Sequence, residues 1–449
     1  MNTPICDFVT EYAQSGKMRL HMPGHKGQGD YERFDITEFD GADVLYNASG
    51  IIRESEDNAA SLFGTQKTLY STEGSSLSIR AMMYLALLYA KQNGKKPVIA
   101  AGRNAHKSFI TAAVLLGFEP EWIYPADFGS VLSCNITPLD LENAIKKMSE
   151  PPTAVYITSP DYLGNIADIK GIAKVCKKYG ALLLVDNAHG AYLGFLTESL
   201  HPIALGADIV CDSAHKTLPV LTGGAYLHIA TSVPEYLTNQ AEQAMALFAS
   251  TSPSYLVLQS LDAANKYLSD GFSQELAAFI PAVNNLKNSL LKAGYTLIGT
   301  EPLKVTVNAK KYGYYGYEIA QILSENGIIC EFYDADFVVM MLSPKNSLDE
   351  LLRLKKALVS VSKKNGITEG CPHIKKPVKI CSPREAFLSA CREVSAEDSL
   401  GKVFASAAIS CPPAVPLIIS GEQIDENTIE LFRYYGIKKC RVSDIPACR

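Results

Sequence analysis

The sequence predicts an α/β protein with a mostly parallel sheet, and two observations support this class. Between residues 61 and 270, short apolar segments typical of buried strands alternate with longer segments of helical periodicity. Asp186 directly follows one apolar segment, 181–185, and Lys216 comes soon after another, 207–211. Strands that alternate with helices favour a parallel sheet, and such sheets bind ligands at the carboxyl ends of their strands.

Each element is predicted by its hydrophobic pattern. In chain order we expect helix 75–92, strand 97–101, helix 139–148, strand 154–158, helix 169–179, and strands 181–185, 208–211 and 225–229. In a smaller α+β region we expect helices 277–292 and 316–326 and strands 304–307, 328–332 and 337–342. We found no internal repeat in the sequence.

Four regions are expected along the chain. Residues 1–60 form an N-terminal arm with little periodicity, and residues 61–270 form a large ligand-binding domain. Residues 271–370 form the small α+β domain, and a Pro/Lys-rich junction opens a C-terminal domain at 371–449. A chain of 449 residues is too long for one typical core, in agreement with this division.

Composition and charge exclude several classes of protein. With 47% hydrophobic and 20% charged residues, the chain is an ordinary globular protein, and its net charge of −5 disfavours nucleic acid and anionic membranes as partners. No secretion signal is recognisable at residues 1–17. The eleven cysteines show no C-x-x-C pair or zinc-ligand spacing, so we expect no metal, reduced thiols and a cytoplasmic location. Cys211 is interpreted as a small buried hydrophobic residue.

Lys216 and Asp186 suggest the chemistry of pyridoxal 5′-phosphate (PLP). A lysine amine can form a Schiff base with this cofactor, and a carboxylate can keep its pyridine nitrogen protonated, so that the ring accepts electrons. Taken alone, either residue would more often be structural or solvated. Their occurrence together at two predicted strand ends favours the cofactor site.

A phosphate site is expected before the helix at 75–92. Gly74 permits close approach of the backbone, and Ser75 and Ser76 place hydroxyls and amides at a helix N-terminus, where anions bind. Ser213 and His215 would reach the same phosphate from the lysine segment. The alternative for Ser75 is an ordinary helix cap.

Three further residues are candidates for the pocket. His106 follows a predicted strand, where an imidazole can stack on a flat ring and donate a proton; a structural histidine is the alternative. Tyr162 lines the pocket or lies on a surface loop, and His189 could support Asp186 through a hydrogen bond.

Several segments together resemble the ornithine/lysine/arginine decarboxylases of PLP fold type I, in their shorter bacterial form. The segments that carry the resemblance, in order along nearly the whole chain, are 21–27 (HMPGHKG), 34–38, 50–54, 103–108, 159–164, 186–195, 213–219 (SAHKTLP), 250–255 and 382–387 (SPREAF). Any one of these motifs alone would be weak, whereas their common order is highly specific.

The resemblance implies a role for each candidate. Lys216 would hold PLP, Asp186 would pair with the pyridine nitrogen, and His106 and Ala188 would pack on opposite faces of the ring. The residues implied for phosphate binding are Ser75, Ser76, Ser213 and His215. Relatives assemble as dimers or larger, with a shared active site, so that Thr251 and Ser252 would reach the neighbouring subunit's phosphate.

The chain also departs from the family pattern at a few positions. Glu73 replaces the usual Asn beside the phosphate site; it is either a substrate-tail contact or an acid favourable at a helix N-terminus. Gly223, Cys411 and Ala414 also differ, which puts substrate specificity in question. Glu393 and Glu397 are further acids that we expect at a solvated surface.

The function predicted from the sequence is PLP-dependent decarboxylation of arginine, lysine or ornithine in polyamine metabolism. Two alternatives stay open. Another fold-type I reaction, such as transamination, would transfer the amino group to a keto acid and release no CO₂. A catalytically silent relative would bind PLP or a partner enzyme and regulate it.

Overall fold

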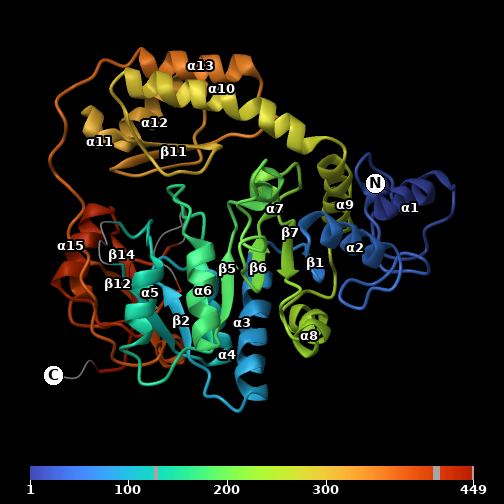
Figure 1. Ribbon diagram of the computed structural model, residues 1–449, viewed down its shortest axis with the longest axis horizontal. Helices are drawn as coiled ribbons and strands as arrows, with labels where there is room; N and C mark the ends of the chain where they lie inside the picture. The colour runs from blue at the N-terminus through green and yellow to red at the C-terminus, as the bar shows by residue number, and fades with distance from the viewer. Residues whose placement is uncertain (126–129, 408–414, 447–449) are drawn as a thin grey trace. The chain divides into compact units, whose positions relative to one another are not determined.

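The computed structural model describes residues 1–125, 130–407 and 415–446. Within these residues the chain forms two compact units, and each unit combines segments that are distant in the sequence (Figure 1). The first unit comprises residues 1–97, 151–157 and 169–274. The second unit comprises residues 98–150, 158–168 and 275–449.

The first unit contains the sheet that positions Asp186 and Lys216. Its strands follow the order β1 (Lys67–Ser71), β7 (Ala225–Ile229), β6 (Ile209–Asp212), β5 (Leu182–Asp186) and β4 (Ala154–Thr158). Strands β5 and β6 are parallel, with Asp186 opposite Cys211, so their carboxyl ends meet at the same edge. Strand β7 is antiparallel to both β6 and β1.

The first unit contains helices that pack on this sheet or on one another. They are α1 (Pro4–Gln14), α2 (Ile51–Phe63), α3 (Ser75–Gln92), α6 (Ile169–Tyr179), the short α7 (Ala214–Thr217), α8 (Glu235–Ala246) and α9 (Tyr255–Ser269). Helix α3 contacts β5, β6 and β7 and buries residues on most of its circumference, as expected for a central helix. Helix α6 buries Ile169, Ile172 and Val175 on one face and exposes lysines on the other.

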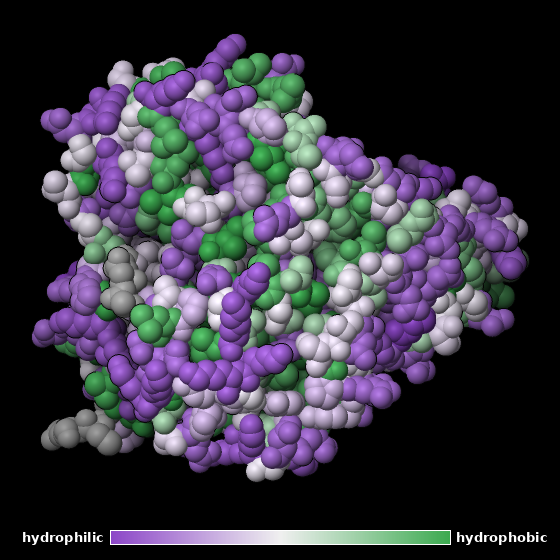
Figure 2. Space-filling view, viewed as in Figure 1, coloured by the Kyte–Doolittle hydropathy of each residue, from purple (hydrophilic) through white to green (hydrophobic). Residues whose placement is uncertain are grey.

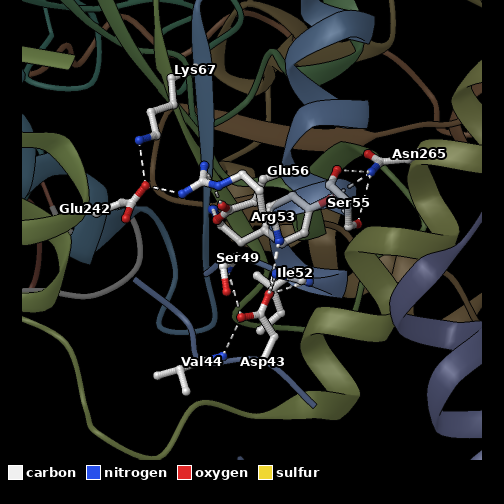
Figure 3. Close-up of polar contacts among 12 residues, drawn as sticks. Asp43, Val44, Ser49, Ile52, Arg53, Ser55, Glu56, Lys67, Glu242 and Asn265 are labelled. Carbon is white, nitrogen blue, oxygen red and sulfur yellow. Dashed lines mark hydrogen bonds and ion pairs between the residues drawn. The ribbon is translucent and has the colours of Figure 1, made fainter. Parts of the chain in front are cut away.

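The N-terminal arm contains structure that its weak periodicity did not predict. Helix α2 begins after Gly50, and the Asp43 carboxylate accepts hydrogen bonds from the backbone N–H groups of Val44, Ser49 and Ile52 at 2.9–3.0 Å (Figure 3). Asp43 thus satisfies amides that a helix N-terminus leaves without a partner. These hydrogen bonds lower the pKa of Asp43 although burial opposes the charged form.

The second unit is built on three groups of strands. They are the parallel pair β2 (Ile99–Gly102) and β3 (Pro120–Ile123), the sheet β10 (Phe332–Tyr333), β11 (Phe337–Met341), β9 (Lys304–Asn308) and β8 (Thr296–Ile298), and the sheet β12 (Cys391–Ser395), β14 (Lys439–Ser443) and β13 (Val403–Phe404). Its helices are α4 (Lys107–Leu116), α5 (Pro138–Ile145), most of α10 (Phe272–Lys292), α11 (Ala309–Tyr312), α12 (Gly316–Glu325), α13 (Leu348–Val359), α14 (Pro383–Leu388) and α15 (Glu426–Tyr434). A core that includes Leu132, Val339 and Phe432 joins parts of this unit.

Most expected elements are confirmed. The helices at 75–92 and 169–179 and the strands at 154–158 and 225–229 have the predicted bounds. Elements that were not predicted include α1, α2, α4, α8, α9, α13, β1 and β3. The predicted strand 328–332 shares only Phe332 with β10. The antiparallel direction of β7 was also missed, because a strand's direction depends on its partners rather than on its own pattern.

Hydrophilic and hydrophobic residues are interspersed on the face drawn in Figure 2. Across the described residues, no helix is both long enough and apolar enough to cross a membrane. The nine cysteines in those residues are all free thiols.

Candidate functional site

The first unit places Asp186 and Lys216 at the carboxyl ends of two adjacent parallel strands, β5 and β6. Asp186 is the last residue of β5, and Lys216 lies in α7, which begins two residues after β6 ends. The backbone N–H of Lys216 donates to Ser213 O at 3.0 Å, which closes the turn that presents the lysine. The Nε2 atom of His189 lies 3.2 Å from Lys216 Nζ, so the imidazole and the amine share one site.

Asp186 is buried and held by several donors. Tyr156 on β4 donates its hydroxyl to Oδ2 at 2.9 Å, and the Ala188 N–H donates to Oδ1 at 3.2 Å. The Cys211 thiol contacts Oδ1 at 3.6 Å, and its own pKa is raised well above the usual range by burial and by the neighbouring Asp186. Cys211 is therefore a buried thiol, as the sequence predicted. These donors hold the Asp186 carboxylate in a fixed orientation.

Ser75 and Ser213, two of the residues expected to bind phosphate, meet at the N-terminus of α3. Gly74 is the residue before the helix and has a positive φ of 71°. No side chain caps this helix, and a Cβ added at Gly74 would meet nothing within 4 Å, so the space before it is open. The Ser213 hydroxyl donates to the Ser75 hydroxyl at 2.8 Å. Two hydroxyls beside a helix N-terminus suit an anion such as phosphate.

Gly223 supports the phosphate cradle, by which we mean Gly74, Ser75 and Ser213 at the N-terminus of α3. Its carbonyl accepts the Gly74 N–H at 2.7 Å, and a Cβ added at Gly223 would lie 2.7 Å from Thr72 O. The φ of Gly223 is 101°, so a larger residue would be strained there as well. The next residue, Gly224, accepts a hydrogen bond from His215 Nδ1 at 3.0 Å. Burial lowers the pKa of His215, and the nearby Lys216 lowers it further.

Glu73 is engaged within its own chain. Its Oε1 atom accepts the Ser250 N–H at 2.7 Å, which ties the 250–252 segment to the cradle. Thr251 and Ser252 themselves are exposed. The geometry thus gives Glu73 a structural contact, and its contact with a substrate tail stays a hypothesis.

Two predicted residues belong to the second unit. His106 precedes α4, and its Nδ1 accepts the Ser108 N–H at 3.2 Å, so the imidazole caps this helix. Tyr162 donates its hydroxyl to Glu331 Oε1 at 3.3 Å and packs edge-on against Phe332.

The remaining predicted positions lie away from the described site or outside the described residues. Glu393 pairs with Lys439, and Glu397 pairs with Arg433, all as exposed side chains, which confirms the solvated positions expected. Cys411 and Ala414 lie outside the described residues.

Sequence reasoning missed two sets of residues. Tyr156 sits in an apolar strand, and a buried tyrosine in such a strand generally needs a hydrogen-bond partner, which was the available signal. The cluster His201, Asp212 and His228 left no signal, because its members come from separate segments and meet only in the folded unit.

A lysine and an aspartate at adjacent parallel strand ends, beside an anion cradle, define an enzyme of PLP fold type I. Solved structures support this fold. The lysine decarboxylase LdcF of Francisella novicida superposes with a TM-score of 0.81 over 98% of this chain and 81% of its own, at 16% identity. The constitutive lysine decarboxylase of Escherichia coli gives a TM-score of 0.76 over 99% of this chain and 82% of its own, also at 16% identity.

The family follows from the sequence comparisons. The family model described as "Orn/Lys/Arg decarboxylase, major domain" matches residues 3–296. The uncharacterized protein YaaO of Bacillus subtilis is 30% identical over 96% of this chain and 93% of its own length. Arginine decarboxylase of the same organism is 28% identical over 95% of this chain and 92% of its own. The chain therefore belongs to the Orn/Lys/Arg decarboxylase family.

Proposed function

We propose that this protein decarboxylates a basic amino acid with PLP as its cofactor. The observation that carries the proposal is the placement of Lys216 and Asp186 on neighbouring strand ends, with the Ser75 and Ser213 hydroxyls in front of α3. An amine, a buried carboxylate and an anion cradle are what this cofactor requires. When bound, PLP supplies an electron sink for the charge left by the departing CO₂.

Each residue contributes a distinct physical effect. Lys216 would provide the amine that holds the cofactor. Asp186, fixed by Tyr156 and Ala188, would stabilise positive charge on the pyridine nitrogen. His189, 3.2 Å from the amine, is placed to exchange a proton with it.

Further assignments complete the proposal. Gly74, Ser75, Ser76, Ser213 and His215 bind the phosphate, and Ala188 and His106 pack on the two ring faces. Tyr162 and Glu73 are candidate contacts for the substrate. The enzyme works as a homodimer or larger assembly in which Thr251 and Ser252 reach the partner's phosphate.

Arginine is the first substrate to test, and lysine and ornithine follow. The 28% identical Bacillus subtilis relative and a 30% identical relative from Halalkalibacterium halodurans are both named arginine decarboxylase. The amine product would enter polyamine metabolism. Free cysteines throughout the described residues agree with action in the reducing cytoplasm.

The test is CO₂ release from arginine, lysine and ornithine by protein purified with PLP, compared with Lys216→Ala. We expect release from at least one substrate and a loss of about 1,000-fold or more in the variant, because the covalent attachment is removed. Lys174→Ala, which changes an exposed lysine on α6, is the matched control and should retain full activity.

Two results would contradict the proposal. Borohydride reduction and peptide mapping could place the cofactor on another lysine, or find none retained. Alternatively, bound PLP with no CO₂ release from any of the three substrates would indicate transamination, if the amino group passes to a keto acid, or a silent relative.

A further inference from the structure

A second cluster of titratable side chains lies buried at the base of the lysine turn. His201 and His228 are 2% and 0% exposed, and Asp212, the last residue of β6, is fully buried. The Nε2 atoms of the two histidines lie 3.0 Å and 3.2 Å from the same oxygen, Asp212 Oδ2. The proposed reaction uses none of these three residues directly.

The partners of the ring nitrogens determine the tautomers. The Ile203 N–H donates to His201 Nδ1 at 3.4 Å, so the ring proton of a neutral His201 is on Nε2 and points at Asp212. His228 Nδ1 lies 2.9 Å from the Thr68 hydroxyl, and burial lowers the pKa of this histidine. Both imidazoles are therefore assigned as donors to the carboxylate through Nε2.

The same pattern disfavours a metal ion at this cluster. A metal would take the Nε2 lone pairs and leave the ring protons on Nδ1. In His201 that proton would face the Ile203 N–H, and two donors would then oppose each other. The cluster is better described as a buried anion held by hydrogen bonds than as a set of metal ligands.

A third donor connects Asp212 to the proposed cofactor site. Asn187, which directly follows Asp186, donates its Nδ2 to Asp212 Oδ1 at 2.7 Å. The Asn187 backbone N–H also donates to Cys211 O at 2.9 Å. Two hydrogen bonds from one residue thus join the end of β5 to the end of β6.

Asp212 also leads directly into the lysine turn. It is followed by Ser213, whose carbonyl accepts the Lys216 N–H and whose hydroxyl donates to Ser75. A shift of Asp212 would therefore move both the amine and the phosphate cradle relative to Asp186.

We propose that Asp212, held by His201, His228 and Asn187, is a positioning residue that sets the distance between Asp186 and Lys216. This inference rests on the proposed function and deepens it, because it names residues that act on the cofactor through their neighbours. Each donor left unpaired by a substitution would weaken the hold on one strand end.

The experiment compares two matched pairs of variants, Asp212→Asn with Asp262→Asn and Asn187→Ala with Asn265→Ala. Asp262 and Asn265 are equally buried polar residues of the same unit, but they lie on α9. For each variant, the PLP dissociation constant, the pH midpoint of the visible absorption band of bound PLP, and the urea unfolding curve are measured. The last measurement separates positioning from a general loss of stability.

We expect Asp212→Asn and Asn187→Ala to raise the PLP dissociation constant by about 10-fold or more and to displace the pH midpoint. Both controls should lose stability but keep the wild-type constant and midpoint. If Asp212→Asn does not fold, Asn187→Ala decides, because it leaves both histidine contacts in place.

Three outcomes would overturn the inference. The variants could match their controls, or lose stability without any change in PLP binding. The third outcome is that Zn²⁺, bound at one ion per chain, raises the free energy of unfolding of wild type but not of Asp212→Asn. The cluster would then be a metal site. If wild-type protein retains no PLP at all, the proposed function itself fails, whereas PLP-binding wild type with control-like variants refutes only the positioning role.

Discussion

Two buried polar networks in the first unit hold carboxylates in different ways. In the Asp212 network, formed with His201, His228 and Asn187, every donor is a side chain, and the network lies at the strand ends beside Lys216. The anchoring network consists of Glu56, Asp262, Ser55, Tyr70 and Asn265, drawn in part in Figure 3. It lies where α2, β1 and α9 meet, and Asp262 accepts the backbone N–H groups of Ile5 and Cys6.

The two networks shift acid pKa values in opposite directions. Burial disfavours the charged form of Asp212, but hydrogen bonds and favourable electrostatics from His201 and His228 outweigh it, and the pKa is lowered. Burial dominates for Glu56 and raises its pKa to about 8, and it raises the pKa of Asp262 as well. Glu56 has one backbone donor, Tyr70 N at 2.9 Å, and an ion pair of 3.5 Å with Arg53, which also pairs with Glu242 (Figure 3).

The number of donors does not by itself decide whether a buried acid stays charged. Asp262 accepts three hydrogen bonds and its pKa is still raised by burial, whereas the pKa of Asp212 is lowered by its two histidine partners. Three donors converge on Asp212 and keep a fixed negative charge near the proposed cofactor site. Glu56 shares its only nearby guanidinium among the described residues and holds a proton near neutral pH. The first arrangement suits a site that needs constant geometry, and the second suits the attachment of the N-terminal segment.

The largest expected effect is a loss of activity in a variant of the candidate site that a variant of the anchoring network does not show. We expect Asp186→Asn to lower kcat by about 100- to 1,000-fold, because the amide no longer stabilises charge on the pyridine nitrogen. Steady-state decarboxylation assays at saturating PLP measure this loss. Asp262→Asn is the control for the anchoring network. A similar loss of kcat in folded Asp262→Asn would show that the two networks do not differ in their effect on catalysis.

The next effect concerns the pH dependence of stability. The folded-state pKa of Glu56, about 8, exceeds its usual value of 4.5, so its contribution is fully present below about pH 4.5 and is lost as pH rises to about 8. A tenfold change in a proton-binding constant corresponds to about 1.4 kcal/mol, and we expect a loss on the order of a few kcal/mol over this range.

Urea unfolding of wild type and Glu56→Gln between pH 4.5 and 8 tests this expectation. The variant should lose this component of the pH dependence, so the difference in unfolding free energy between the two proteins should change with pH. Asp212 has the opposite sign, since its lowered pKa makes its contribution disappear only as pH falls below its usual value of 3.8. A constant difference between wild type and Glu56→Gln would show that Glu56 is not the protonated group.

The smallest expected effect concerns the stability of helix α2 in the N-terminal arm. Asp43→Ala removes the carboxylate that caps α2, and we expect a loss of about 1–2 kcal/mol in the free energy of unfolding. Asp43→Asn should cost less, because asparagine still accepts hydrogen bonds and tolerates the positive φ of 67° at this position. Equal losses in both variants would mean that charge, rather than capping geometry, stabilises the helix.

The candidate site illustrates what can be predicted from sequence. Lys216, Asp186 and Ser213 were predicted from their places after apolar segments, and Ser75 from its place at a helix N-terminus. The structure pairs Ser75 with Ser213, and it places Asp186 at the end of β5 and Lys216 in α7, just after the adjacent β6. Tyr156 and the Asp212 network were not predicted. Their partners lie in other segments of the chain, so the local sequence could indicate that Tyr156 needs a partner but not which residue that partner is, and it gave no indication of the Asp212 network.

By itself, the sequence determined the α/β class, the bounds of helices such as α3 and α6, and the residues capable of the proposed chemistry, because these depend on local periodicity and residue type. Only the tertiary structure decided the antiparallel direction of β7, the capped helix α2 in the N-terminal arm, and the convergence of three donors on Asp212. These features depend on which distant segments become neighbours, since a buried carboxylate is stable only where folding brings donors to it.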